Sequence, residues 1–113
     1  MSTAAPRQPI SYGHTPLDVV ASMSGIDFLR KMFAGELPHA TMMQQVGLTG
    51  GSAEPGLVVF TAVPGPEHYN PIGSVHAGFT ATLLDSAMGC AVQSMLPQGR
   101  LYITLEFKVT LIK

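Results

Sequence analysis

The apolar residues of this chain change their spacing along its length, and each spacing predicts a different kind of element. In the N-terminal third they recur at the interval of an α-helical face: Ile26, Leu29, Met32 and Phe33. Thr15-Pro16 and Ser24 are residues that begin helices, and each is followed by an acid within one turn. The pattern therefore predicts two short helices, broken near Gly25, the second of which ends before Gly35.

Beyond Pro38 the pattern is typical of β-structure. Residues Ala40–Leu48 are expected to form a strand and the glycine-rich stretch Gly50–Gly56 a turn. The β-branched run Leu57–Val63 predicts a second strand, paired with the first as a hairpin.

The C-terminal half predicts one long helix and one long strand. From Ala77 to about Leu96 apolar residues surround the whole helix, so we expect it to be buried on nearly all sides. Residues Leu101–Ile112 alternate apolar and polar positions, as in a half-buried antiparallel strand. The expected fold is α+β, a curved antiparallel sheet wrapped around one central helix.

Length and charge limit the possible classes of protein. With 113 residues the chain is long enough for one domain, predicted over residues 15–113 behind a flexible lead over residues 1–14. Charged residues make up 12% of the chain and the net charge is −1, which argues against nucleic-acid binding. So few charges suggest that another subunit covers part of the surface.

The chain shows no sign of export or membrane insertion. Its N-terminal residues lack the apolar core of a signal peptide, and Asp85 interrupts the one apolar stretch long enough to span a bilayer. The single Cys90 excludes an internal disulfide and is expected to be a buried apolar residue in a cytoplasmic protein without membrane contact.

The most informative candidate for chemistry is Asp85, the only charged residue between Glu67 and Arg100. Burial disfavours an ionised carboxylate, so an acid on an apolar helix must be paired, hydrogen-bonded or functional. A purely structural Asp85 that caps a backbone turn or pairs with Lys108 is the alternative.

Three residues before or at the start of the same helix could take part in that chemistry. His76 is a candidate acid or base, or a cap for the helix, and Asn70 before Pro71 is a candidate amide ligand or an ordinary turn residue. The free N–H of Ala77 could stabilise an oxyanion. Ala77 and Asp85 are about 12 Å apart along the axis, so a site that uses both needs two subunits.

A resemblance to a known family joins these residues. The run Asn70-Pro71-Ile72-Gly73-Ser74-Val75-His76-Ala77-Gly78, followed by Leu84-Asp85 and Ala87-x-Gly89, resembles the N-x-x-G-x-x-H-G-G-(six)-D motif of hotdog-fold acyl-CoA thioesterases of the phenylacetate-degradation (PaaI-like) type. The resemblance covers about residues 38–113. It implies a hotdog fold whose C-terminal strands are missing from this chain, and assembly into homodimers or homotetramers. Where the family has a glycine, this chain has Ala77.

The resemblance also implies a role for each matching residue. Asp85 falls on the family's nucleophile or general base, and Asn70 on the amide that holds the thioester or the water. His76 falls on the motif histidine, the Ala77 N–H on the oxyanion donor, and Thr104 on a hydroxyl that assists the acid.

The substrate implied is an acyl-CoA, so coenzyme A belongs to the substrate and no separate cofactor is expected. Candidate substrate-binding residues are Gly78, Phe79, Leu83 and Arg100, and no histidine spacing predicts a metal site. A non-catalytic hotdog module that binds acyl-CoA is the main alternative. A hotdog dehydratase is a weaker one, because no histidine follows Ala77.

Overall fold

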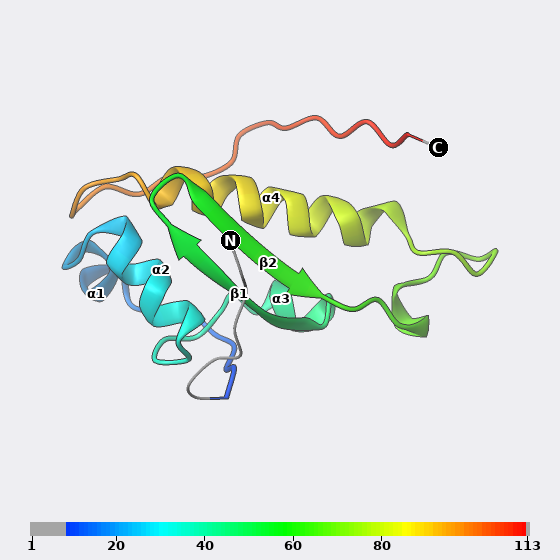
Figure 1. Ribbon diagram of the computed structural model, residues 1–113, viewed down its shortest axis with the longest axis horizontal. Helices are drawn as coiled ribbons and strands as arrows, with labels where there is room; N and C mark the ends of the chain where they lie inside the picture. The colour runs from blue at the N-terminus through cyan, green and yellow to red at the C-terminus, as the bar shows by residue number, and fades with distance from the viewer. Residues whose placement is uncertain (1–8, 113) are drawn as a thin grey trace.

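The computed structural model describes residues 9–112, and over that range the chain is an α+β domain. In chain order its elements are α1 (Leu17–Ala21), α2 (Gly25–Phe33), α3 (Met42–Gln45), β1 (Leu48–Glu54), β2 (Leu57–Ala62), η1 (Pro66–His68, a 3-10 helix) and α4 (Ala77–Gln93). β1 and β2 form a two-stranded antiparallel hairpin that lies against one side of α4. Helix α2 packs against β1 and lies to the left of the hairpin in Figure 1.

The two predicted N-terminal helices and the break near Gly25 are confirmed, but the predicted cap at Thr15 is wrong, because Pro16 is the N-cap of α1 and no side chain caps that helix. The hydroxyl of Ser24 accepts a hydrogen bond from the Asp27 N–H and begins α2, which ends at Phe33. Gly35, with φ of 85°, follows the C-cap Ala34 and stops the helix in the left-handed conformation that glycine favours. The break at Gly25 also has a tertiary cause, because its N–H donates to the Leu96 carbonyl beyond the end of α4.

The predicted first strand and turn are wrong in position. Residues 42–45 form α3, and the strand begins only at Leu48 and continues to Glu54 through the stretch predicted as a turn. Gly51 lies inside β1, and this position needs glycine because a Cβ there would overlap the Val59 carbonyl and the Phe33 ring. The turn itself is confined to Pro55 and Gly56. The second strand is confirmed as β2.

Two clusters of buried residues form the core. The first joins α2 to β1 through Leu29, Met32, Phe33 and Ala53. The second joins α3 to the start of β1 through Met43, Val46 and Leu48, with Phe79 and Leu83 of α4 packed against it. Met43 and Val46 are three residues apart, the spacing of one helical face, which explains why this apolar stretch forms a helical turn rather than a strand.

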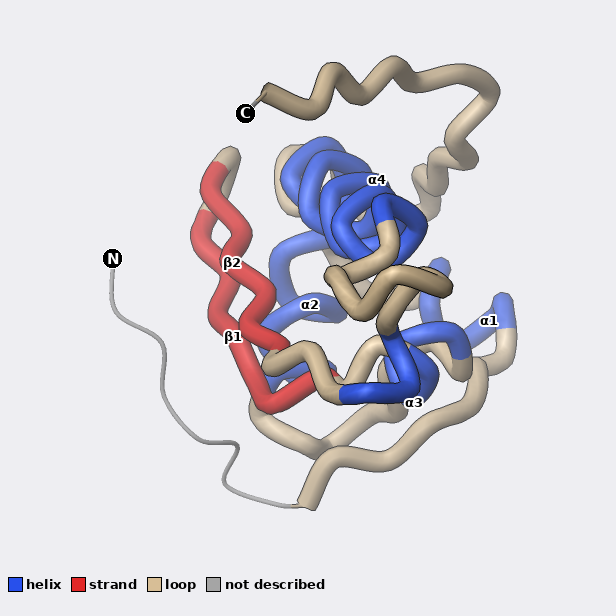
Figure 2. The backbone as a smooth tube through the Cα atoms, turned by 90° about the vertical axis from the view of Figure 1, so that its right-hand side faces the viewer, coloured by secondary structure: helices blue, strands red, loops and turns tan. Residues whose placement is uncertain are grey.

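The predicted C-terminal strand is wrong. Residues 101–112 have no regular secondary structure. They pass over α4 on the side away from the hairpin (Figures 1 and 2). A strand needs a neighbour for its backbone hydrogen bonds, and no strand of the described residues lies there. The apolar positions of the segment stay in contact with solvent, with Ile103 80% and Leu105 89% exposed.

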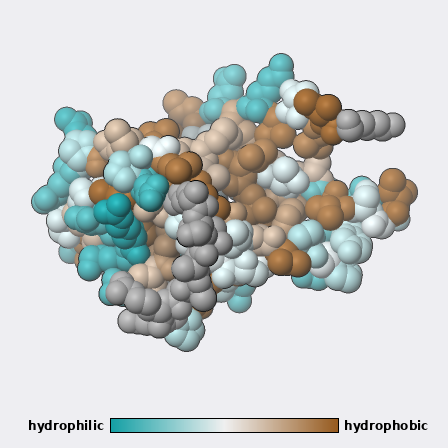
Figure 3. Space-filling model, viewed as in Figure 1, coloured by the Kyte–Doolittle hydropathy of each residue, from teal (hydrophilic) through white to brown (hydrophobic). Residues whose placement is uncertain are grey.

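The prediction that the long helix is buried on nearly all sides is also wrong for a single chain. α4 runs from Ala77 to Gln93, close to the predicted bounds, but the hairpin and α2 cover only one side of it. Leu84, Met88 and Val92 remain between 39% and 53% exposed. In the space-filling view apolar residues gather over the middle of the molecule, where α4 and β2 lie (Figure 3). None of the helices in residues 9–112 is long and apolar enough to cross a membrane.

The predicted N-terminal lead, residues 1–14, falls partly outside the described residues, which begin at residue 9. Within the described part, residues 11–13 pair with His39: its N–H donates to the Ser11 carbonyl at 2.9 Å, and the Gly13 N–H donates to the His39 carbonyl at 2.9 Å. These bonds attach the chain before α1 to the segment that precedes α3.

The His39 side chain lies in the core against two aromatic rings. Its ring is edge-on to Phe33, with centroids 5.2 Å apart, and 6.2 Å from Phe60. Neither ring nitrogen has a hydrogen-bond partner within the described residues. Burial lowers the pKa of His39 below its usual 6.5, an effect that the nearby Met32 backbone partly offsets.

We predict that replacing His39 by phenylalanine makes the free energy of unfolding less dependent on pH below 6.5. The pKa of His39 in the folded state lies below 6.5, so between that pKa and 6.5 the unfolded chain binds more protons than the folded one. The free energy of unfolding therefore falls as the pH drops below 6.5. Urea unfolding of wild type and His39→Phe at several pH values measures the slope. Equal slopes in the two proteins would show that His39 does not cause the acid sensitivity.

We predict that Gly25→Ala destabilises the domain by about 1–3 kcal/mol. A Cβ at Gly25 would overlap the backbone carbonyl of Gln93, which cannot move without disturbing the end of α4. Gly13→Ala is the matched control, because a Cβ there makes only ordinary contacts with Pro38. Thermal unfolding compares the two, and an equal change in both variants would contradict the close approach of α2 to α4.

Candidate functional site

Asp85 lies near the middle of α4, on the side over which residues 101–107 pass. Its carboxylate Oδ1 accepts a hydrogen bond of 2.9 Å from the Thr104 hydroxyl. Within the described residues Asp85 makes no ion pair, with Lys108 or any other cation. The structure thus brings together two predicted site residues that are nineteen positions apart, and leaves Oδ2 of the carboxylate without a protein partner in the described range.

Gly89 explains how the segment carrying Thr104 comes so close to α4. Gly89 is buried one turn beyond Asp85, and the phenol ring of Tyr102 lies directly against it, where any Cβ would overlap the ring. Burial, followed by the electrostatic influence of Cys90 and Asp85, raises the pKa of Tyr102 to about 12. The phenol therefore stays neutral, and its packing on glycine places Thr104 two residues later beside Asp85.

Cys90 lies in the same region and is held as a thiol. Burial, with a smaller contribution from the Asp85 carboxylate, raises its pKa to about 11. Since the thiolate is the reactive form, Cys90 is an apolar wall residue rather than a nucleophile.

Asp85 borders three cavities, so its carboxylate is reachable from more than one direction. One of about 510 Å³ lies between the outer face of α4 and residues 102–107. A second of about 600 Å³ lies between α1, α2, α4 and residues 101–104. A third of about 400 Å³ lies toward Met42, Met43 and Phe107. The acid is only half-buried, which differs from the fully buried carboxylate that the sequence suggested.

At the start of α4 the predicted polar residues bond to their own backbone. His76 Nδ1 accepts from the Gly78 N–H at 3.0 Å and caps the helix. The Asn70 amide oxygen accepts from the N–H groups of Ile72 and Ser74, both at 3.1 Å, and its NH₂ donates to the Ser74 hydroxyl. These are the capping and turn roles that the sequence left open beside the catalytic ones.

Ala77 keeps the feature expected of an oxyanion donor. It is exposed, and its N–H makes no hydrogen bond to the part of the chain that the structure describes. Asp85 is two helical turns further along α4, about 12 Å away, so the two groups do not meet within one chain.

The predicted substrate-binding residues separate into three environments. Phe79 and Leu83 pack into the core, Phe79 also lying 4.7 Å from the His68 ring. Gly78 is exposed and borders both a cavity of about 230 Å³ near the start of the helix and the cavity of about 400 Å³ that Asp85 also borders. Arg100 is exposed in the turn after α4, where its N–H donates to the Pro97 carbonyl, and it borders none of the four cavities. The structure does not bring Arg100 to Asp85.

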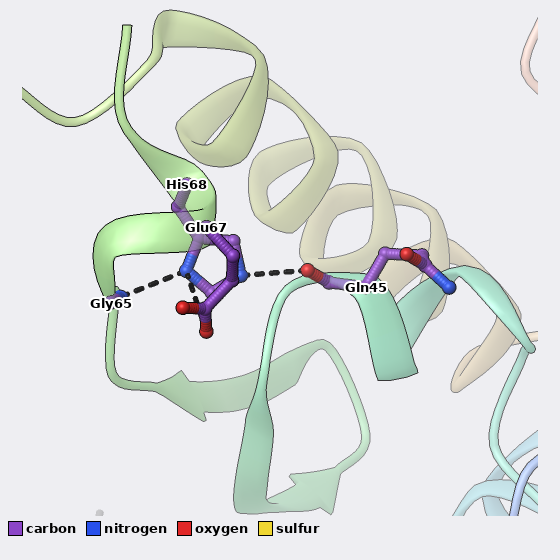
Figure 4. A network of polar contacts seen from close by, with 4 residues as sticks. All are labelled: Gln45, Gly65, Glu67 and His68. Carbon is purple, nitrogen blue, oxygen red and sulfur yellow. Dashed lines mark hydrogen bonds and ion pairs between the residues drawn. The ribbon is translucent and has the colours of Figure 1, made fainter.

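His68 holds the segment before α4 in place, a role that the sequence did not reveal. Its buried ring accepts from the Gly65 N–H at Nδ1 (2.9 Å) and donates from Nε2 to the Gln45 carbonyl (2.7 Å), with a Glu67 oxygen 3.7 Å from Nδ1 (Figure 4). Its own carbonyl accepts from the His76 N–H at 2.7 Å. His68 thereby connects the end of α3 to the cap of α4 and sets where that helix begins.

No group of three metal-binding side chains occurs within residues 9–112. Comparison of the chain with protein-family models, with curated proteins and with solved structures finds no match.

We predict that Gly89→Ala loosens residues 101–104 without unfolding the domain. The added methyl group would displace the Tyr102 ring, a movable side chain, and the Thr104 hydroxyl with it. Hydrogen-exchange mass spectrometry should show faster amide exchange over residues 101–104, with α2 and the hairpin unchanged. Unaltered exchange in that segment would show that the Tyr102 contact does not hold it.

Proposed function

We propose that this protein is an acyl-CoA thioesterase of the hotdog type, in which Asp85 cleaves the thioester. The observation that carries the proposal is the Asp85 carboxylate, hydrogen-bonded to Thr104 on one oxygen and bordered by apolar cavities. The motif resemblance from Asn70 to Asp85 supplies the reaction class. α4 is the enclosed helix of the proposed fold, and the hairpin is part of the surrounding sheet.

The chemistry follows from the two oxygens of the carboxylate. The Thr104 hydroxyl holds Oδ1, and Oδ2 takes a proton from a water molecule. The oxygen of that water attacks the carbonyl carbon, and the electron pair of the carbonyl moves onto its oxygen. When the tetrahedral intermediate collapses, the C–S bond breaks, and the coenzyme A thiolate leaves and takes up a proton. Attack by Oδ2 itself on the carbonyl carbon, with a mixed anhydride that water then cleaves, is the other route.

The developing oxyanion needs a donor, and the free N–H of Ala77 in a second copy of the chain would supply it. This assignment follows from the 12 Å that separate Ala77 and Asp85 on one helix. A homodimer or homotetramer in which a second copy covers the exposed side of α4 also removes Leu84, Met88 and Val92 from water.

One observation favours a binding module without catalysis. The side chains of Asn70 and His76 are already used in the turn and the cap, and Ala77 stands at the glycine of the family motif. Such a module would be stabilised by acyl-CoA without hydrolysing it. Thermal unfolding and turnover measured with the same acyl-CoA distinguish the two functions.

We predict that Asp85→Asn and Asp85→Ala each lower acyl-CoA hydrolysis by about 10²–10⁴-fold, because both lack the proton acceptor. Release of free coenzyme A with aryl and medium-chain substrates measures the rate. Glu54→Gln, at an exposed acid that ends β1, is the control and should keep wild-type activity. Full activity in both Asp85 variants would refute the proposed function.

A further inference from the structure

Two of the cavities beside Asp85 share a wall, formed by residues 102–104, and differ in what lies opposite. The outer cavity faces Met88 and Val92, both on the exposed side of α4. The inner cavity faces Leu29 and Met32 of α2, which belong to the packed core and are 1% and 7% exposed. Packed walls hold their shape, so of these two cavities the inner one is the better suited to discriminate ligands by size.

The lining of the inner cavity is mainly apolar, with Asp85, Thr104, Tyr102 and Gln93 as its polar members. The Asp85 carboxylate and the Thr104 hydroxyl lie on one wall, and Leu17, Phe28, Leu29 and Met32 form the opposite side. The neutral Cys90 thiol continues the apolar lining. Its volume of about 600 Å³ falls in the range of small-molecule sites. This arrangement fits a ligand with a carbonyl group at one end and a hydrocarbon group at the other.

We infer that the acyl group of the substrate occupies the inner cavity between α1, α2 and α4, and that Leu17 limits the length of acyl chain accepted. This inference rests on the proposed function and assigns the acyl group to residues other than the predicted Phe79 and Leu83. Leu17 lies on α1 at the edge of the cavity and is 73% exposed. A larger side chain there would therefore shorten the cavity without disturbing the core.

The test uses Leu17→Trp, with Val19→Trp as the matched control. Val19 lies on the same short helix, is also exposed, and borders none of the four cavities near Asp85 and the start of α4. Binding of non-hydrolysable S-alkyl-CoA thioethers with short and long alkyl groups is measured by calorimetry. Leu17→Trp should weaken binding of the long thioethers about tenfold or more and leave the short ones near wild type. Val19→Trp should change neither.

The same comparison separates this inference from the proposed function. Asp85→Asn should keep the wild-type preference for thioether length while losing hydrolysis. Absence of turnover in the wild-type protein refutes the proposed function, yet the thioether series still decides where the alkyl group binds. The inference is overturned if Leu17→Trp and Val19→Trp show the same length dependence, or if the wild-type chain binds no thioether.

Discussion

The arrangement of this domain depends on α4, a helix with apolar side chains around its whole circumference. Every face of such a helix gains free energy when it leaves contact with water. The hairpin and α2 remove one side of α4 from water. At Gly25 the backbone of α2 lies so close to the Gln93 carbonyl of α4 that no side chain fits between them. The remaining side is covered only in part, by residues 101–107, which lie across it without forming a strand. Incomplete cover leaves room for the cavities beside Asp85.

Asp85 lies at the boundary between the covered and the uncovered sides of α4. A carboxylate in the fully packed interior would need strong partners, and one on the outer surface would act as an ordinary solvated charge. At the boundary a single hydroxyl, that of Thr104, holds one oxygen while the other stays available. Tyr102 brings Thr104 to Asp85 by packing directly on Gly89, which has no side chain in the way. A glycine on α4 and an acid one turn before it are therefore parts of one arrangement.

Histidines position the elements around the site by different means. The His68 ring connects the end of α3 to the chain that enters α4, and its carbonyl holds the backbone of His76. The His76 ring satisfies a helix-end N–H that would otherwise lack an acceptor. His39 instead pairs through its backbone with residues 11–13 and places its ring among aromatic residues. None of these roles needs a protonated imidazole, which agrees with the apolar surroundings of His39.

Local patterns determined the elements whose stabilising interactions are local. The two N-terminal helices, the second strand and the long helix follow from caps, glycine stops, β-branched residues and apolar periodicity in the sequence. The position of Asp85 on that helix, and a possible cap at His76, follow in the same way. The meeting of Asp85 with Thr104 came from the motif resemblance, because no local rule relates residues so far apart.

The tertiary structure decided the elements that depend on a partner. Gly50 and Gly51 indicated a turn, yet both lie in β1, and at Gly51 the Val59 carbonyl and the Phe33 ring leave no room for a side chain. The alternating segment from residue 101 has the pattern of a strand, but residues 9–112 offer it no neighbouring strand to bond with, so alternation alone could not make it one. The choice of the inner cavity likewise depends on how α1 and α2 pack against α4. Sequence patterns report the preferences of each segment, whereas hydrogen-bond partners and packed walls exist only once distant segments meet.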